Sequence, residues 1–278
     1  MERYLRFPDG KPKALTLSYD DGVVYDRKLI EIMQKHGIKG TFNLNSASMG
    51  VSTSRRLTRD ECIELYTNSG MEVAIHGNGH QFPNALHGIE IYKEFVLDKE
   101  NLEDMFGGVI RGLAYAQGRY SDEVVSVLKQ IGVAYARTTE TTKSFEIPTD
   151  WLRLKPTCHH YEPTLNKLVD DFVNFDHNTN RNKNPLLFYL WGHSYEFNDH
   201  DNWNIFEEFC EKISGKEDIW YATNIEIYDY IKAYEGLNFS ANGEFVQNNS
   251  AIDVYMFVRG GFAGKVVCAK AGTTTKIL

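Results

Sequence analysis

The clearest structural signal in this chain is the stretch Ala14-Leu15-Thr16-Leu17-Ser18-Tyr19-Asp20-Asp21-Gly22, in which an apolar run ends in two adjacent carboxylates. The apolar run predicts a buried strand. Barrel enzymes place catalytic groups where a strand runs out into a loop, and successive side chains there point in different directions. One carboxylate could then bind a metal while its neighbour handles a proton. Asp-Asp-Gly is also good turn chemistry, so an ordinary turn stays an equal alternative on these residues alone.

Short apolar runs alternate with amphipathic stretches as far as residue 234, which is the rhythm of parallel strands joined by helices. Strands are predicted at residues 14–18, 40–44, 72–75, 112–115, 134–137, 152–155, 186–191 and 219–222. Helical patterns lie at residues 26–36, 59–68, 90–106, 122–131, 165–175, 203–212 and 224–234. The fold class is therefore α/β, with seven or eight βα units in a closed or nearly closed barrel over residues 1–236.

The character of the chain changes after Gly236. Residues 237–278 have no helical period and show short β-type runs separated by glycines. They predict a small C-terminal β appendage that either packs on the barrel or binds carbohydrate.

Composition excludes several classes of protein. The net charge of -8 argues against a nucleic-acid partner, which would need a basic face. The four cysteines are widely spaced and form no CxxC pair, so free thiols are expected. The N-terminus lacks the apolar run of a secretory signal, and no stretch of about 18 apolar residues occurs. We therefore expect a cytoplasmic protein with no membrane partner, or a secreted one if a signal was removed.

Two histidine clusters also follow predicted strands. They are His76-Gly77-Asn78-Gly79-His80, after the third strand, and Leu190-Trp191-Gly192-His193-Ser194, at the end of the seventh. Two imidazoles four residues apart can share a metal ion, as in the HExxH proteases, but the glycines and the missing glutamate favour a loop and exclude the protease. A lone histidine is usually structural. Three clusters rich in aspartate and histidine, all at strand ends, are improbable as coincidence.

These clusters resemble motifs of the polysaccharide deacetylase family, the NodB-like deacetylases of carbohydrate esterase family four. Residues 18–22 are similar to its first motif, Thr-Phe-Asp-Asp-Gly, and residues 76–80 to its second, His-Ser/Thr-x-x-His, with Gly77 departing at the small position. The strand-end His193 resembles its last motif. The similarity covers about residues 13–235.

The resemblance implies a distorted (β/α) barrel, with Asp21, His76 and His80 as metal ligands, Asp20 as catalytic base and His193 as acid. Three protein ligands leave open positions, as catalytic sites require. The expected cofactor is one divalent metal ion, zinc first, with cobalt, nickel, manganese or iron as alternatives. The expected reaction is hydrolysis of an N-linked acetyl group on a carbohydrate, by attack of a metal-bound water.

Two departures from the family's pattern concern the third and fourth motifs. The third is usually Arg-Pro-Pro-Tyr, whose arginine positions the base, but residues 112–118 place Ala114 at the arginine and Gln117 at the tyrosine. The Gln117 backbone N–H could still serve an oxyanion, because a main-chain donor does not depend on the side chain. Arg111, Arg119 and Arg153 are candidates for the missing arginine. The fourth motif, which orients the acid, has only Asp150-Trp151 as a weak counterpart.

Several polar and aromatic residues could line a substrate site at the same barrel face. The candidates are Tyr115, Trp191, Tyr195 and His159, with His160 and Glu196 beside them. Two other functions remain open: an amidohydrolase acting on a small non-sugar amide, and an inactive carbohydrate-binding homologue. Because base, ligands and acid are all present, the second is disfavoured.

Overall fold

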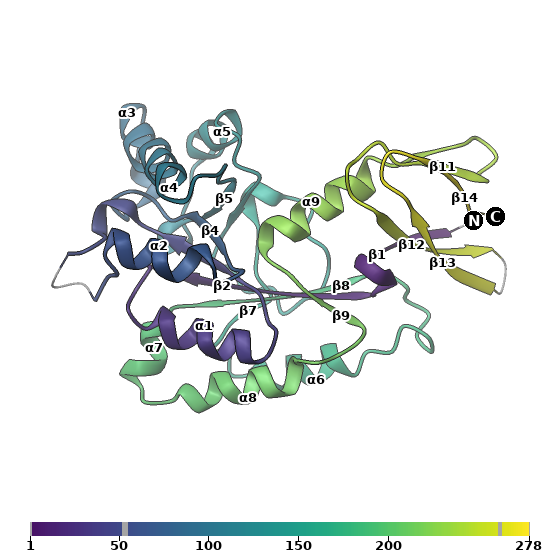
Figure 1. Cartoon of the computed structure of the whole chain (residues 1–278), viewed down its shortest axis with the longest axis horizontal. Helices are drawn as coiled ribbons and strands as arrows, with labels where there is room; N and C mark the ends of the chain where they lie inside the picture. The colour runs from purple at the N-terminus through teal and green to yellow at the C-terminus, as the bar shows by residue number, and fades with distance from the viewer. Residues whose placement is uncertain (1, 52–54, 261–262, 278) are drawn as a thin grey trace.

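The computed structural model describes residues 2–51, 55–260 and 263–277. Its centre is a parallel sheet curled into a half-barrel, with strand order β6-β5-β4-β3-β2-β8-β7 and with β9 beside the first half of β2 (Figure 1). The strands are β2 (Lys13–Asp20), β3 (Thr41–Leu44), β4 (Glu72–Ile75), β5 (Gly112–Ala114), β6 (Tyr135–Arg137), β7 (Cys158–His159), β8 (Leu186–Gly192) and β9 (Ile219–Tyr221). The predicted α/β barrel is confirmed in this open form, and the carboxyl ends of its strands share one edge.

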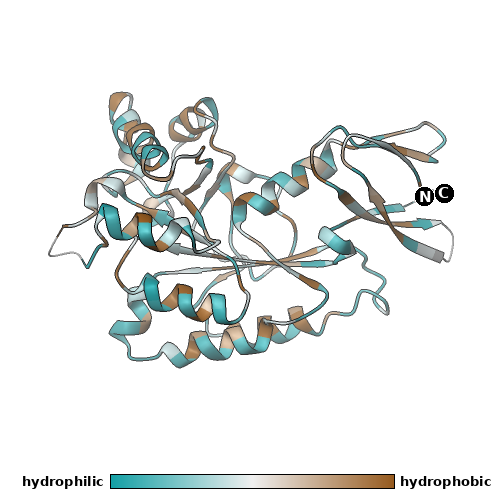
Figure 2. Ribbon diagram, viewed as in Figure 1, coloured by the Kyte–Doolittle hydropathy of each residue, from teal (hydrophilic) through white to brown (hydrophobic). Residues whose placement is uncertain are grey.

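Helices cover the outside of the half-barrel. They are α1 (Asp26–Lys35), α2 (Arg59–Thr67), α3 (Ile89–Ile91), α4 (Leu97–Phe106), α5 (Asp122–Gln130), α6 (Leu165–Val173), α7 (Ser194–Asp199), α8 (Trp203–Ile213) and α9 (Asn224–Glu235), with a π-helical turn at Tyr92–Val96 between α3 and α4. Figure 2 shows apolar and hydrophilic residues interspersed along α1 and α8. Met33 of α1 and Phe206 of α8 belong to one buried cluster with Leu17 and Phe188 of the sheet, which fixes the helices against it.

The strand predicted at residues 152–155 is wrong. Residues 151–153 form a 3₁₀ turn, and a single parallel bridge joins Arg137 to Leu154. The edge strand is β7 instead, three residues farther along. Pro156 explains the shift, because proline has no N–H to donate to a sheet ladder. β6 and β7 are therefore the two edge strands of the half-barrel. The segment 138–157 fills the gap between them, which we call the seam.

The C-terminal appendage consists of two three-stranded antiparallel sheets, ordered β1-β12-β13 and β10-β11-β14. Their strands are β1 (Glu2–Arg6), β10 (Asn238–Phe239), β11 (Phe245–Gln247), β12 (Val254–Gly260), β13 (Ala263–Ala269) and β14 (Thr274–Lys276). The predicted boundary at residue 236 is thus incomplete, because the N-terminal strand β1 pairs with β12 rather than with the barrel. Apolar residues of β12, such as Met256, belong to the hydrophobic core of the appendage.

The appendage lies at the end of the molecule where β2 begins (Figure 1). The short turn at Pro8–Gly10 leads from β1 almost directly into β2, so the appendage sits opposite the carboxyl edge of the sheet. The four cysteines, all within the described residues, are free thiols. Among the described residues, no helix is long and apolar enough to cross a membrane.

Candidate active site

Five side chains from the three sequence clusters converge at the carboxyl edge of the sheet. Asp20 ends β2 and Asp21 follows it, His76 and His80 follow β4, and His193 follows β8. The Nε2 atom of His76 lies 3.8 Å from Asp20 Oδ2 and 3.8 Å from Asp21 Oδ1. His80 Nε2 lies 3.8 Å from Asp21 Oδ1, and His193 Nε2 lies 3.9 Å from Asp20 Oδ2. The parallel sheet thus brings together residues up to 173 positions apart.

The donor set of Asp21, His76 and His80 fits a divalent cation. One potential ligand atom from each residue lies within 4.8 Å of the other two. His76 Nδ1 is 2.9 Å from the carbonyl oxygen of Ala114, so this nitrogen carries the proton and leaves Nε2 free to bind a metal. Burial lowers the pKa of His76, which keeps the imidazole neutral. One carboxylate and two imidazoles are a common zinc set with positions left open.

The backbone at two of these residues adopts a conformation that non-glycine residues rarely take. Asp21 has φ of 89° and His80 has φ of 56°. Such strained residues cluster at functional sites and persist where the surroundings hold them. The N–H of Asp21 donates to Asn43 O at 2.9 Å, and Arg56 Nη2 donates to Asp21 Oδ1 at 2.9 Å. Arg56, which the sequence patterns do not indicate, therefore orients the carboxylate.

Asp20 forms a buried, bidentate ion pair with Arg137 at the end of β6. Arg137 Nη2 lies 2.7 Å from Asp20 Oδ1 and 2.5 Å from Oδ2, and Asn43 Nδ2 donates to Oδ1 at 2.8 Å. Burial alone would raise the pKa of Asp20, but Arg137, with smaller contributions from His76 and His193, lowers it to about 2. The carboxylate is therefore ionised and fixed in direction across the neutral pH range.

Arg137 occupies the place that the sequence leaves open for a missing arginine, and the three candidates for that place are engaged elsewhere. Arg137 could have been recognised in the sequence, because it is the last residue of the predicted strand 134–137 and so lies at the carboxyl edge of the sheet. Arg111 pairs with Asp229, Arg153 pairs with Asp122 and Asp150, and Arg119 lies over the ring of Phe82.

His193 is oriented by Glu196, three residues farther along the chain. Glu196 Oε2 lies 3.3 Å from His193 Nδ1 and also accepts the His193 N–H at 3.2 Å, as a capping interaction at the start of α7. Burial would lower the pKa of His193, but Glu196, Asp20 and Asp21 outweigh it and raise the pKa. Asp150, the weak sequence candidate for this role, is instead hydrogen-bonded to Arg153.

Two further histidines surround the same glutamate oxygen. His159 Nε2 lies 3.2 Å and His160 Nε2 lies 3.1 Å from Glu196 Oε2. These three residues form a second group with metal-ligand spacing. However, His159 Nδ1 accepts the N–H of Tyr161 at 3.2 Å, so its proton lies on Nε2 and faces the carboxylate. A metal-bound histidine normally donates from its other nitrogen, so His159 supports Glu196 as a hydrogen-bond donor instead.

The remaining predicted site residues differ in whether they reach the carboxyl edge of the sheet. Gln117, with φ of 57°, lies in the turn that follows β5, just beyond the carbonyl that fixes His76. Tyr115 is fully buried and its hydroxyl donates to Leu152 O, so it offers no surface to a substrate, contrary to expectation. The strand pattern puts it on the core-facing side. Trp191 lies 4.5 Å from the Arg137 guanidinium, and the ring of Tyr195 is 5.1 Å from that of His193.

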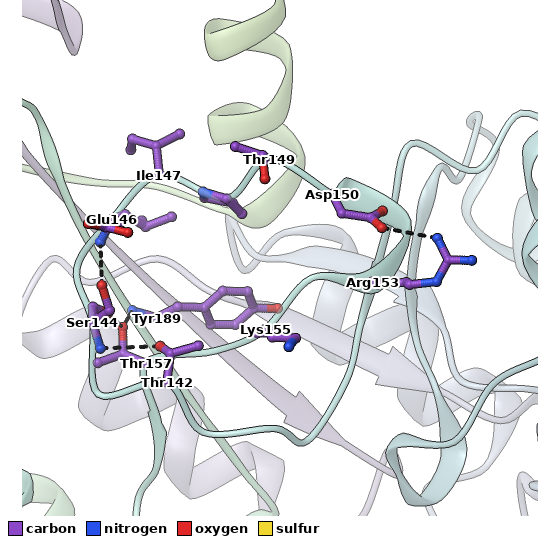
Figure 3. Close-up of a pocket in the computed structure, with 12 residues that line it drawn as sticks. Thr142, Ser144, Glu146, Ile147, Thr149, Asp150, Arg153, Lys155, Thr157 and Tyr189 are labelled. Atoms are coloured by element: carbon purple, nitrogen blue, oxygen red, sulfur yellow. Dashed lines mark hydrogen bonds and ion pairs between the residues drawn. The ribbon is translucent and has the colours of Figure 1, made fainter.

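A cavity of about 350 Å³ lies at the seam between β6 and β7, lined mainly by the segment 142–157 (Figure 3). Three of its four charged lining groups lie in ion pairs: Arg153 pairs with Asp150, which also lines the cavity, and Lys155 pairs with Glu140. None of the five residues that converge at the carboxyl edge is among its 12 lining residues. The cavity is therefore separate from the candidate active site.

Comparisons with known proteins show what this chain is similar to in sequence and in fold. Residues 8–136 match the family model described as polysaccharide deacetylase. The curated protein "Putative polysaccharide deacetylase YxkH" of Bacillus subtilis (strain 168) is 25% identical over 135 residues, which cover 48% of this chain and 47% of that protein. The chain thus matches about half the length of this relative.

Two solved structures share the fold. One is a putative polysaccharide deacetylase from Mycobacterium smegmatis, with 14% identity, a TM-score of 0.57 and coverage of 84% of this chain and 94% of that one. The other is a family 4 carbohydrate esterase from Streptomyces lividans in complex with acetate, with 13% identity, a TM-score of 0.51 and coverage of 75% and 91%. Residues 8–136, a little under half of the chain, are thus similar to the polysaccharide deacetylase family, and the chain shares the fold of these two structures.

Proposed function

We propose that this protein is a metal-dependent hydrolase that removes an acetyl group from an amide nitrogen of a carbohydrate. The convergence of Asp20, Asp21, His76, His80 and His193 at one edge of the sheet carries the proposal. It supplies a base, three metal ligands and an acid within one site. The match of residues 8–136 to the polysaccharide deacetylase family model supports the same chemistry.

Each group has a distinct role in this proposal. A divalent cation held by Asp21, His76 and His80 supplies polarisation of the scissile carbonyl and a water nucleophile available at neutral pH. Asp20 accepts the proton of the attacking water, and Arg137 keeps its carboxylate ionised and correctly directed.

His193 completes the reaction on the other side of the scissile bond. Its raised pKa favours the protonated imidazole, which can donate from Nε2 to the departing amine, a group that leaves poorly unless protonated. Its Nε2 lies 3.9 Å from Asp20, which suits an acid and a base that act on opposite ends of one bond. The backbone N–H of Gln117 is the proposed donor to the oxyanion.

The test is acetate release by metal-stripped and metal-restored protein from acetylated chito-oligosaccharides, peptidoglycan fragments, acetylated xylan and small N-acyl compounds. Metal-dependent release from an N-acetyl sugar is expected. Asp20→Asn should retain the metal and lose roughly two or more decades of rate. Reaction with a small amide alone would replace the carbohydrate substrate with a non-sugar one. Normal turnover by metal-replete Asp20→Asn would refute the assigned base.

A further inference from the structure

The loop that carries both histidine ligands is held by two buried carboxylates on a neighbouring helix. Asp98, which is fully buried, accepts the N–H of His76 at 3.2 Å and that of Gly77 at 3.0 Å through Oδ2. Its Oδ1 accepts the N–H of Ser46 at 2.8 Å. The carboxylate thus fixes the start of the ligand loop and joins it to the segment after β3.

Glu94 holds the second half of the same loop. Its Oε2 accepts the N–H of Gly79 at 3.1 Å, and its Oε1 accepts the N–H of Gln81 at 2.8 Å. The main-chain carbonyl of Glu94 accepts the N–H of Asn78 at 2.7 Å. Glu94 is 4% exposed, whereas Gly79 and Gln81 are exposed, so a buried carboxylate holds a surface segment of the loop. The residues on both sides of His80 are therefore anchored to one side chain.

The two carboxylates come from one helical segment. Glu94 lies in the π-helical turn Tyr92–Val96, and Asp98 lies in the first turn of α4, four residues later. Residues four apart share a helix face, so both side chains reach the same loop. Single π-helical turns within helices are frequent at functional sites. Here Glu94 lies within the turn and Asp98 follows it, and together the two carboxylates contact both halves of the ligand loop.

Gly77 fits this arrangement and explains a departure from the family pattern. The residue has φ of +90°, and a Cβ atom there would lie 2.3 Å from Glu94 Oε1. The serine or threonine of the pattern His-Ser/Thr-x-x-His could not occupy this position without moving Glu94. Glu94 can therefore keep this position only because residue 77 is a glycine.

We propose that Glu94 and Asp98 are positioning residues that hold His76 and His80 in metal-binding geometry through the backbone of their loop. The inference rests on the proposed function, since it assumes that these histidines bind a metal. Burying two carboxylates is costly unless hydrogen bonds compensate, and here the backbone N–H groups of the ligand loop, Gln81 and Ser46 donate to them. Partners behind metal ligands typically contribute 10- to 100-fold in metal affinity.

The test compares zinc affinity in Glu94→Gln and Asp98→Asn with that in Glu100→Gln, an exposed acid on the same helix. An amide places an NH₂ group against a loop N–H where the carboxylate offered an acceptor, so each site variant should bind zinc about 10- to 100-fold more weakly. Isothermal titration of the full chain with a competing chelator measures the affinity. Circular dichroism and the unfolding midpoint of the metal-free protein report the fold. Glu100→Gln should match the wild type in all three.

Gly77→Ala provides an independent variant, because its Cβ displaces Glu94 without removing a carboxylate; it should also weaken zinc binding. Zinc affinity within twofold of the wild type in Glu94→Gln and Asp98→Asn, with a lowered unfolding midpoint, would overturn the proposal and leave a purely structural role. If the wild type binds zinc but releases no acetate, the proposed function fails while the positioning role is still decided by the affinities. If the wild type binds no zinc, both fail.

Discussion

Replacing Arg137 with methionine tests the partner assigned to the catalytic base. Methionine keeps much of the volume of the side chain but leaves the Asp20 carboxylate buried without its bidentate partner. The pKa of Asp20, about 2 in place of 3.8, corresponds to ~2.5 kcal/mol in favour of the ionised form. Since Arg137 also offsets the effect of burial, its removal should raise that pKa by roughly two units or more.

Two measurements follow from this magnitude. If the same ~2.5 kcal/mol is lost from the transition state, kcat/KM for metal-replete enzyme should fall about 70-fold. The free energy of unfolding, from urea denaturation, should fall by about 3–5 kcal/mol, as expected when one partner of a buried pair is removed. Arg137→Lys keeps the positive charge without the bidentate geometry. Its kcat/KM and its free energy of unfolding should therefore lie between those of the wild type and those of Arg137→Met.

Arg111→Met is the matched control, because Arg111 also makes a paired contact with a carboxylate, that of Asp229, but is about one-third exposed. It should change kcat/KM by less than about twofold. The reasoning is refuted if Arg137→Met folds, binds metal and retains wild-type kcat/KM, or if Arg111→Met loses as much activity as Arg137→Met.

Two further predictions concern pH. The acid His193 is active when protonated and its pKa is raised by Glu196, so the wild-type kcat/KM should decline with rising pH only above pH 6.5. In Glu196→Gln that decline should move to lower pH with a loss of about 100-fold in rate, and an unshifted pH profile would contradict the assignment. Burial raises the pKa of Glu72 from 4.5 to about 7, so its stabilising effect is complete below pH 4.5 and lost as the pH rises through 7. Glu72 should therefore lower the wild-type free energy of unfolding by ~3 kcal/mol between pH 4.5 and 8, in addition to the losses from Asp26 and Asp98, whose pKa values burial also raises to about 7. Glu72→Gln should reduce the total drop by that ~3 kcal/mol, and equal slopes would refute the assignment.

The sequence was sufficient for the parts of the fold that depend on local periodicity. Seven of the predicted strands lie within one or two residues of observed strands, because each is a short apolar run bounded by turn residues. The eighth failed at Pro156, where the missing N–H moves the edge strand to Cys158 and His159. The pairing of β1 with β12 could not be predicted, because it joins residues more than 240 positions apart.

Some residues of the candidate site could likewise be identified from the sequence, and others could not. Asp21, His76 and His80 were identifiable because each lies within a few residues of the end of a predicted strand, and parallel strands share one carboxyl edge. Arg137 and Glu196 were not assigned their partners, because the sequence does not show which guanidinium or carboxylate reaches across the barrel. Arg137 acts from β6, whereas the family pattern has its arginine after the preceding strand.

The pairing of β1 with β12 also determines how the molecule can be attached to something else. The first and last described residues, Glu2 in β1 and Ile277 after β14, both lie in the appendage, at the end of the molecule where β2 begins (Figure 1). The carboxyl edge with the candidate active site is at the other end of the barrel. A tag, a solid support or a fusion partner joined through either terminus would therefore leave the catalytic edge facing outward, accessible to a substrate too large to diffuse.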